Sequence, residues 1–307
     1  MTDLYSDTVP APAPAPALGV PVRDPAPSAA TAAEGPGWRP PAAIAPRGTL
    51  LLLPGRGEHP FVYERFGRRL SADGYVVHAL GTTPDDTAEE ILRRAADATG
   101  PGPVGPVVLV GSDTGALQAL HTAAHTAAAA GARLPVGGVV VAGTAPTSRV
   151  AEPLPGSATG PDTEPGADTA TGPETDPGAG TGTAWDAELA ARTACPTHRK
   201  RLTEDEGFVR GLLAGPVPDR LLAEALPDVP VLVLHGGSDP VTPPGQARDL
   251  AAGLPRATLG VVRDGLHDVL NDASHRTTAA VLVLWLERLR AGPELTPILT
   301  VEQGAAL

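Results

Sequence analysis

The chain has 307 residues, with 36 glycines, 36 prolines and a formal net charge of −12. The excess of acidic residues argues against nucleic acid as the main partner. Cys195 is the single cysteine, so it cannot form an internal disulfide. The sequence contains neither the long apolar run of a membrane span nor a signal peptide. We therefore expect a cytoplasmic protein with no membrane span.

Two segments hold much of the unusual composition. Residues 1–37 include an alternation of proline and alanine, and residues 151–184 consist mostly of glycine, proline, threonine, alanine and acids. The second segment has six acidic residues and no basic one, so it supplies half of the net charge. Segments with so little apolar surface do not form a packed core. Both are predicted to be disordered.

The remaining sequence alternates between strand and helix patterns. In chain order, it predicts a strand over 49–53, a helix over 61–70, a strand over 75–77, a helix over 85–98, a strand over 107–110, a helix over 116–130 and a strand over 136–142. After residue 226 the alternation continues with a strand over 231–234, a helix over 246–252, a strand over 258–262 and a helix over 277–289. Uniformly apolar strands, each followed by a helix, are typical of a parallel sheet covered on both faces. We therefore predict an α/β fold with a doubly wound, mostly parallel sheet.

Residues 185–226 have a helical pattern with breaks at Pro196, Gly207 and Gly215. We expect them to form a helical cap, inserted with the acidic segment after the strand that ends near residue 142. Asn271 is predicted to cap the last helix, with Asp272 adding favourable charge there. The predicted core comprises residues 38–150 and 227–292, followed by a C-terminal tail over 293–307.

Polar residues follow three of the predicted strands, where α/β sheets place their reactive groups. The first group is Gly111-Ser112-Asp113-Thr114-Gly115, in which Gly111 and Gly115 match the sharp turn of a nucleophile elbow. The second ends at Asp239 and the third contains His267. A nucleophile, then an acid, then a histidine is the chain order of α/β-hydrolases.

Three stretches of the sequence carry a more specific resemblance. The resemblance is to monoacylglycerol lipases and lysophospholipases, a serine-aminopeptidase-like family. Their first-strand loop resembles residues 53–59 and 63–66 of this chain, their acid-bearing loop resembles residues 233–241, and their histidine segment resembles residues 265–272. The match covers roughly residues 47–150 and 185–290 and implies the α/β-hydrolase fold.

The resemblance also implies roles for individual residues. Asp239 would orient His267, which would act as the general base. The backbone N–H groups of Arg56 and Thr114 would form the oxyanion hole. A cap between the strands would extend over residues 151–226.

The sequence departs from this family at the central position of the elbow, where the lipases carry serine and this chain carries Asp113. A carboxylate that attacks an ester carbonyl gives a mixed anhydride, whereas attack on a saturated carbon gives an ordinary ester that water can hydrolyse. We therefore expect a hydrolase that acts on a small, apolar substrate through an ester of Asp113. Haloalkane dehalogenases and epoxide hydrolases of the same fold work in this way. No tryptophan follows Asp113 and no tyrosine lies in the predicted cap, so their usual electrophilic helpers are not found at these positions. Trp185 stays open as an active-site tryptophan.

Two alternatives stay open at this point. In the first, a shifted elbow makes Ser112 the nucleophile of an esterase or lysophospholipase. In the second, the chain is a non-catalytic member of the fold that binds a ligand. No cofactor and no metal is expected, because His121 and His125 lie four apart on a helix without a third ligand. The expected partner is a small-molecule substrate, with no obligate protein partner.

Overall fold

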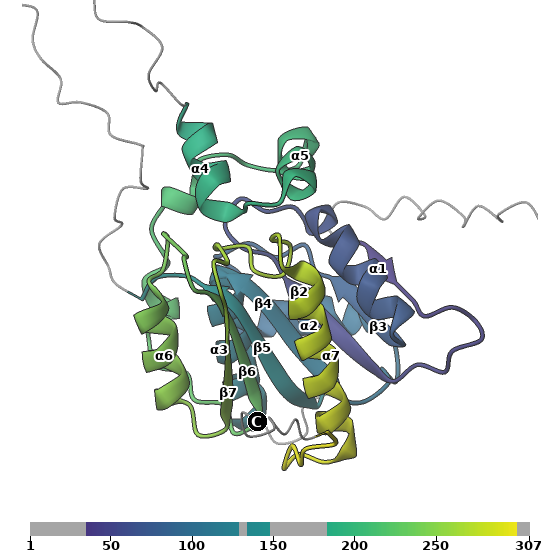
Figure 1. Ribbon diagram of the computed structural model, residues 1–307. Coiled ribbons are helices and arrows are strands. Elements are labelled where there is room, and N and C mark those ends of the chain that lie inside the picture. Colours follow the sequence, from purple (N-terminus) through teal and green to yellow (C-terminus); the bar gives the residue numbers. More distant parts are fainter. Residues whose placement is uncertain (1–34, 129–133, 148–182, 300–307) are drawn as a thin grey trace, which may run out of the picture.

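The computed structural model of the chain describes residues 35–128, 134–147 and 183–299. A seven-stranded sheet forms its centre (Figure 1), with the strands in the spatial order β1-β3-β2-β4-β5-β6-β7. All neighbouring strands are parallel except β1 and β3. The strands are β1 (Gly37–Trp38), β2 (Gly48–Leu53), β3 (Tyr75–Ala79), β4 (Val107–Asp113), β5 (Val136–Thr144), β6 (Val231–Gly236) and β7 (Ala257–Val262). The predicted α/β architecture is confirmed.

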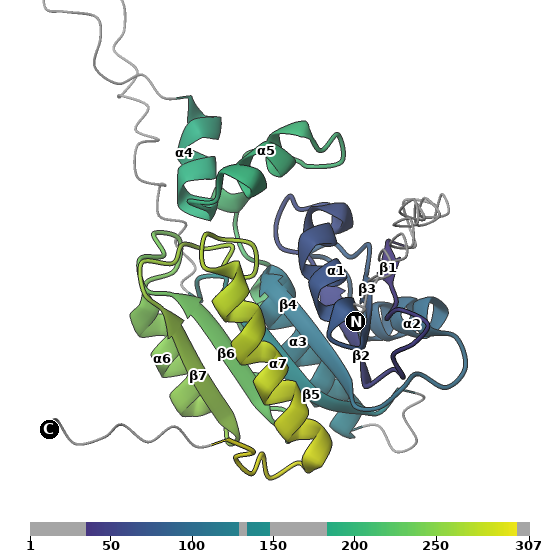
Figure 2. The same cartoon turned by 45° about the vertical axis from the view of Figure 1, so that its right-hand side comes forward.

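Helices cover both faces of the sheet, as Figure 2 shows. One face packs against α1 (Glu64–Ala72) and α7 (His275–Ala291). The opposite face packs against α2 (Ala88–Thr99), α3 (Thr114–Ala128) and α6 (Pro244–Gly253).

Strand β2 shows why the chain folds in this way. Its six residues are all buried, with Leu50 and Leu52 in the core on the α1 and α7 side and Leu51 and Leu53 in the core on the opposite side. A strand with two buried faces reads as a continuous apolar run rather than an alternating one. The other predicted strands also overlap the observed ones, with ends shifted by a few residues.

The cap lies beyond the carboxyl ends of the strands and begins with α4 (Ala184–Arg192) and α5 (Pro196–Glu204). After α5 the predicted helical pattern is wrong, because the chain forms only two short 3₁₀ turns, η2 (Leu212–Ala214) and η3 (Asp219–Leu221). The glycines and prolines between residues 207 and 218 interrupt helical hydrogen bonding there.

The prediction of Asn271 as the N-terminal capping residue of the last helix is also wrong. Ser274, not Asn271, precedes α7. Asp272 instead accepts hydrogen bonds from the Thr193 hydroxyl and from the backbone N–H groups of Ala194 and Leu266. Its carboxylate thus joins the cap to the loop that carries His267, and it satisfies backbone donors that lie outside any helix or strand.

Strand β1 was not predicted, because a two-residue strand gives no sequence pattern. It pairs with β3 through Gly37, the last residue of the predicted N-terminal tail, and Trp38. Most of the two segments predicted to be disordered lies outside the described residues, which leave out 1–34 and 148–182. The described residues also leave out 129–133 and 300–307. A short 3₁₀ helix, η1 (Pro60–Tyr63), leads into α1. Among the described residues, no helix is both long and apolar enough to cross a membrane.

Candidate active site

The junction of β4 and α3 forms the sharp turn that the two elbow glycines predicted. Strand β4 ends at Asp113 and α3 begins at Thr114, with no residue between them. Asp113 has a φ of 51°, in the left-handed region that non-glycine residues rarely adopt. A Cβ at Gly111 would lie 2.1 Å from the Gly115 carbonyl oxygen, so only glycine allows the strand and the helix to approach this closely.

His267 lies between two carboxylates. Its Nδ1 is 2.8 Å from Asp239 Oδ2, and its Nε2 is 3.3 Å from Asp113 Oδ1. The other Asp239 oxygen accepts hydrogen bonds from the backbone N–H groups of Val241 and Thr242, which fix its orientation. The structure therefore brings together the three residues that the sequence singled out, from the end of β4 and from the loops that follow β6 and β7.

The side chain of Arg56 forms a bidentate ion pair with Asp113. Arg56 Nε donates to Asp113 Oδ2 at 2.8 Å, and Nη2 donates to Oδ1 at 2.7 Å. The backbone N–H of Arg56 also donates to Oδ2 at 2.8 Å. The N–H assigned to an oxyanion hole thus contacts an oxygen of Asp113 itself.

Four charged groups therefore meet in the protein interior, and none of the four residues Arg56, Asp113, Asp239 and His267 is more than 4% exposed. Burial alone would raise the pKa of Asp113, but Arg56 and His267 together hold it well below its usual range. Burial alone would lower the pKa of His267, but Asp239 and Asp113 raise it to about 10. Two carboxyl groups, an imidazole and a guanidinium thus lie in direct contact in the interior.

Thr114 and Ser112 flank Asp113 and are both buried. Thr114 is the first residue of α3, so its backbone N–H belongs to the first turn, where helical donors have no partner within the helix. The Ser112 hydroxyl interacts with the phenol of Tyr63. Both ring nitrogens of His267 face carboxylates, Nδ1 towards Asp239 and Nε2 towards Asp113.

A second cluster of buried charges lies beside the first, around Arg192 of α4. Its guanidinium is fully buried and forms ion pairs with Glu58, Glu188 and Asp268. It also donates a 2.6 Å hydrogen bond to the backbone carbonyl of Arg56. Burial and the nearby Asp268 raise the pKa of Glu58 to about 7. Arg192 thus ties the cap to the loop that carries Arg56.

Sequence reasoning did not find the Arg56 side chain or the Arg192 cluster. The resemblance implied a role for Arg56 only through its backbone N–H, and no role was predicted for Arg192. One signal was present: a glycine-flanked arginine after a buried strand needs a carboxylate partner if the loop folds inward. Sequence alone does not say which carboxylate.

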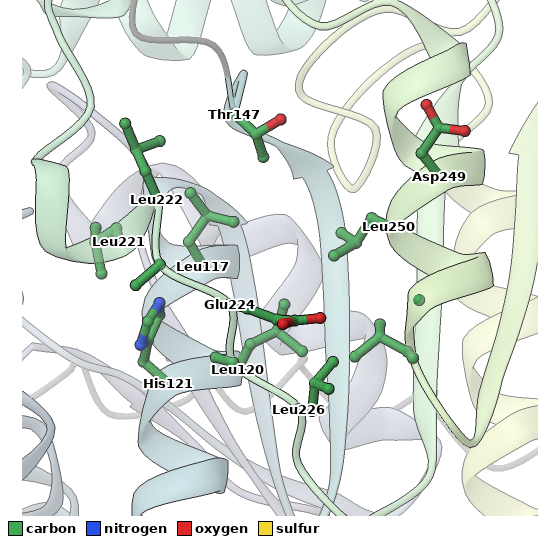
Figure 3. A pocket seen from close by; sticks show the side chains of 14 residues that line it. Leu117, Leu120, His121, Thr147, Leu221, Leu222, Glu224, Leu226, Asp249 and Leu250 are labelled. Carbon is green, nitrogen blue, oxygen red and sulfur yellow. The ribbon is translucent and has the colours of Figure 1, made fainter.

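Two cavities lie away from these residues. Figure 3 shows one of about 190 Å³ between α3 and α6, lined mainly by leucines together with His121, Glu224 and Asp249. The other, of about 370 Å³, lies between α1 and α5 and is lined in part by Arg65, Arg68 and Arg201. Neither is lined by Asp113, Asp239 or His267.

The two helical histidines have different neighbours. His125 Nε2 is 3.3 Å from Glu89, whereas His121 lines the leucine cavity of Figure 3. Across the residues that the structure describes, no cluster of three or more His, Cys, Asp or Glu residues could hold a metal ion.

Comparison with known proteins places this geometry in a family. Residues 50–283 match the model of the "Alpha/beta hydrolase family". The structure is similar to a monoacylglycerol lipase from Paleococcus ferrophilus, with a TM-score of 0.56, 21% identity and coverage of 82% of this chain and 97% of the lipase.

Two further solved structures share the fold. A soluble variant of monoglyceride lipase from Saccharomyces cerevisiae has a TM-score of 0.53 at 15% identity, with 83% of this chain and 91% of the lipase covered. The meta-cleavage product hydrolase CumD from Pseudomonas fluorescens has a TM-score of 0.55 at 16% identity, with 78% and 90% covered. No curated protein sequence matches the chain. The match over residues 50–283, together with the observed fold, shows that the chain belongs to the alpha/beta hydrolase family.

Proposed function

We propose that this protein is a hydrolase that uses Asp113 as its nucleophile and acts at a saturated carbon of a small, apolar substrate. The observation that carries the proposal is the different surroundings of the two Asp113 oxygens. Both oxygens accept from the Arg56 side chain, but only Oδ1 also faces His267 Nε2, and only Oδ2 also accepts the backbone N–H of Arg56. One oxygen is thus placed to react beside the histidine, and the other lies in a site that stabilises negative charge.

The reaction has two steps. Asp113 Oδ1 attacks the carbon, forms a carbon–oxygen bond, and expels the leaving group with its bonding electron pair. Water then gives a proton to His267, and its oxygen attacks Cγ of the resulting ester. In the tetrahedral intermediate, the negative charge resides on Oδ2, where the Arg56 N–H donates to it. Collapse releases an alcohol and restores the Asp113 carboxylate.

The charges around His267 fit a change of role between these steps. In the resting site, two carboxylates hold the imidazole in its protonated form, with its pKa raised to about 10. Formation of the ester removes the charge of Asp113 and leaves only Asp239 beside the ring. The pKa of His267 then falls, because the attraction that kept Nε2 protonated is lost. The neutral ring is the general base that the second step requires.

The same features argue against lipase chemistry in this chain. A carboxylate attacking an ester carbonyl would give a mixed anhydride, and the ring nitrogens of His267 face Asp239 and Asp113. The proposed substrate therefore differs from that of the monoacylglycerol lipases, although the fold is similar.

We also propose a cytoplasmic location.

One observation favours a second candidate function. A buried bidentate pair such as Arg56–Asp113 also suits an aspartate that has only a structural role. In that case the chain would be a non-catalytic member of the fold that binds a small molecule.

Turnover assays on a panel of alkyl halides, epoxides and carboxylic esters separate these functions. We expect Asp113→Asn to abolish turnover of a halide or an epoxide, while Ser112→Ala retains it. Loss of activity in Ser112→Ala alone, with labelling by a fluorophosphonate, would establish the serine enzyme instead. Absence of turnover across the panel, together with tight binding of a small molecule, would support the non-catalytic function.

A further inference from the structure

The side chain of Arg56 lies between the proposed nucleophile and the cap. Its Nε and Nη2 contact the two oxygens of Asp113, and its Nη1 donates to the backbone carbonyl of Gly215, in the cap segment that follows η2. The guanidinium therefore bridges Asp113 and the cap.

The charge balance of the site changes when Asp113 reacts. At rest, Asp113 and Asp239 balance Arg56 and His267, all within the buried interior. An ester of Asp113 is neutral, so Arg56 would become a buried cation without a partner. An unpaired charge in the interior is strongly unfavourable. A leaving group that departs as an anion next to Arg56 removes this cost.

We propose that Arg56 is the electrophilic catalytic residue of this site and transfers its guanidinium contact from Asp113 to the leaving atom as the carbon–oxygen bond to Asp113 forms. The inference rests on the proposed function and narrows its substrate class. The substrates are those whose leaving atom departs as an anion, namely a halide or the ring oxygen of an epoxide.

The atoms and protons balance for both substrates. With an alkyl halide, the carbon–halogen bond breaks, the halide takes the electron pair, and His267 releases its proton to solvent before the water step. With an epoxide, the ring oxygen takes the electron pair and then the His267 proton, or a proton from water in a variant that lacks His267. Water supplies the remaining oxygen and hydrogens of the alcohol or diol. No oxidant, reductant or cofactor is required.

The main-chain contacts of Arg56 allow its side chain to move alone. Its backbone N–H donates to Asp113 Oδ2, and its carbonyl accepts from Arg192 Nη2. These contacts hold the loop in place while the guanidinium exchanges partners. The Arg56 side chain therefore takes the place of the tryptophan that does not follow Asp113 and of the tyrosine that the cap does not contain.

The test measures formation of the Asp113 ester with a series of leaving groups. In a His267→Gln background the ester should accumulate, because the general base is missing, and mass spectrometry of the elbow peptide quantifies it. The probes are 1-iodobutane, 1-bromobutane and 1-chlorobutane, with styrene oxide as the epoxide. Each is compared with and without Arg56→Gln, and with Arg69→Gln, an exposed arginine of α1 paired with Asp73, as the control.

Loss of the ion pair with Asp113 changes the reactivity of the carboxylate equally for all probes, whereas loss of an electrophile slows the poorest leaving group most. We expect Arg56→Gln to slow esterification by the chloride on the order of 100-fold more than it slows the iodide, a size typical of one lost charge-stabilising donor. Styrene oxide should behave like the chloride, and Arg69→Gln should change nothing.

An equal effect of Arg56→Gln on all four probes would show that Arg56 is only structural, while the ester itself would still support the proposed function. Absence of any ester on Asp113 would overturn both. If Arg56→Gln does not fold, Arg56→Lys decides the question. Lysine keeps the charge but loses the planar fork, so the gap between chloride and iodide should widen; an unchanged gap would contradict the role of Arg56.

Discussion

The sheet and the boundary between sheet and cap are both buried, but different forces stabilise them. Around β2 and β4 the interior is apolar, and residues such as Leu51 and Val110 need only a partner of suitable size. Under the cap the interior is ionic, with Arg56 paired to one carboxylate and Arg192 surrounded by three. Burial in this protein therefore means close packing in one region and specific charge pairing in the other.

The largest expected effect on stability is at Arg192. Replacing it with leucine removes the cation that three buried carboxylates share, so Arg192→Leu should lower the free energy of unfolding by about 3–5 kcal/mol. Leu51→Ala, in the apolar region, should cost about 2–5 kcal/mol through loss of packing. Urea denaturation measures both. An Arg192→Leu protein as stable as the wild type would show that the ionic region does not depend on pairing.

The pair Arg56–Asp113 offers a sharper test. Arg56→Gln alone leaves the carboxylate of Asp113 with fewer partners, and we expect a loss of about 3 kcal/mol. In the double variant Arg56→Gln with Asp113→Asn, neither side chain is charged, so most of that loss should be recovered. A double-mutant cycle in urea provides the coupling energy. Additive losses would contradict a direct ionic interaction.

The pH dependence of stability should separate the two regions as well. The folded pKa of His267 is raised to about 10 from an unfolded value near 6.5, so its stabilisation is complete below pH 6.5 and is lost as pH rises toward 10. We expect the free energy of unfolding to fall between about pH 7.5 and pH 10 by about 3 kcal/mol. The lower limit avoids the titration of Glu58, whose pKa is about 7. His267→Gln should abolish most of this slope, and Leu51→Ala should retain it.

The smallest effect is expected at the surface of the cap. Lys200 and Glu204 form an exposed ion pair one helical turn apart on α5. Exposed pairs of this kind contribute little, so Lys200→Ala should leave the midpoint of thermal or urea denaturation almost unchanged. A clear loss of stability would mean that charge pairing matters beyond the buried boundary.

The same division explains what could be predicted from the sequence. The apolar runs of the strands and the glycines around Asp113 depend on local patterns, so the sheet, the elbow and the order Asp113, Asp239, His267 could be recognised. The end of the cap helices after Glu204 and the pairing of β1 could not, because tertiary contacts decide them. The partner of Arg56 depends on which carboxylate faces it in three dimensions, and a one-dimensional pattern does not contain that information.

The position of a single oxygen atom tests the central claim most directly. One turnover of a reactive halide or epoxide in water enriched in heavy oxygen should leave the heavy atom in the Asp113 carboxylate, because water attacks Cγ of the ester. The alcohol formed in that first turnover should carry ordinary oxygen. Heavy oxygen in the first product, with none in the peptide that contains Asp113, would contradict an ester at this residue.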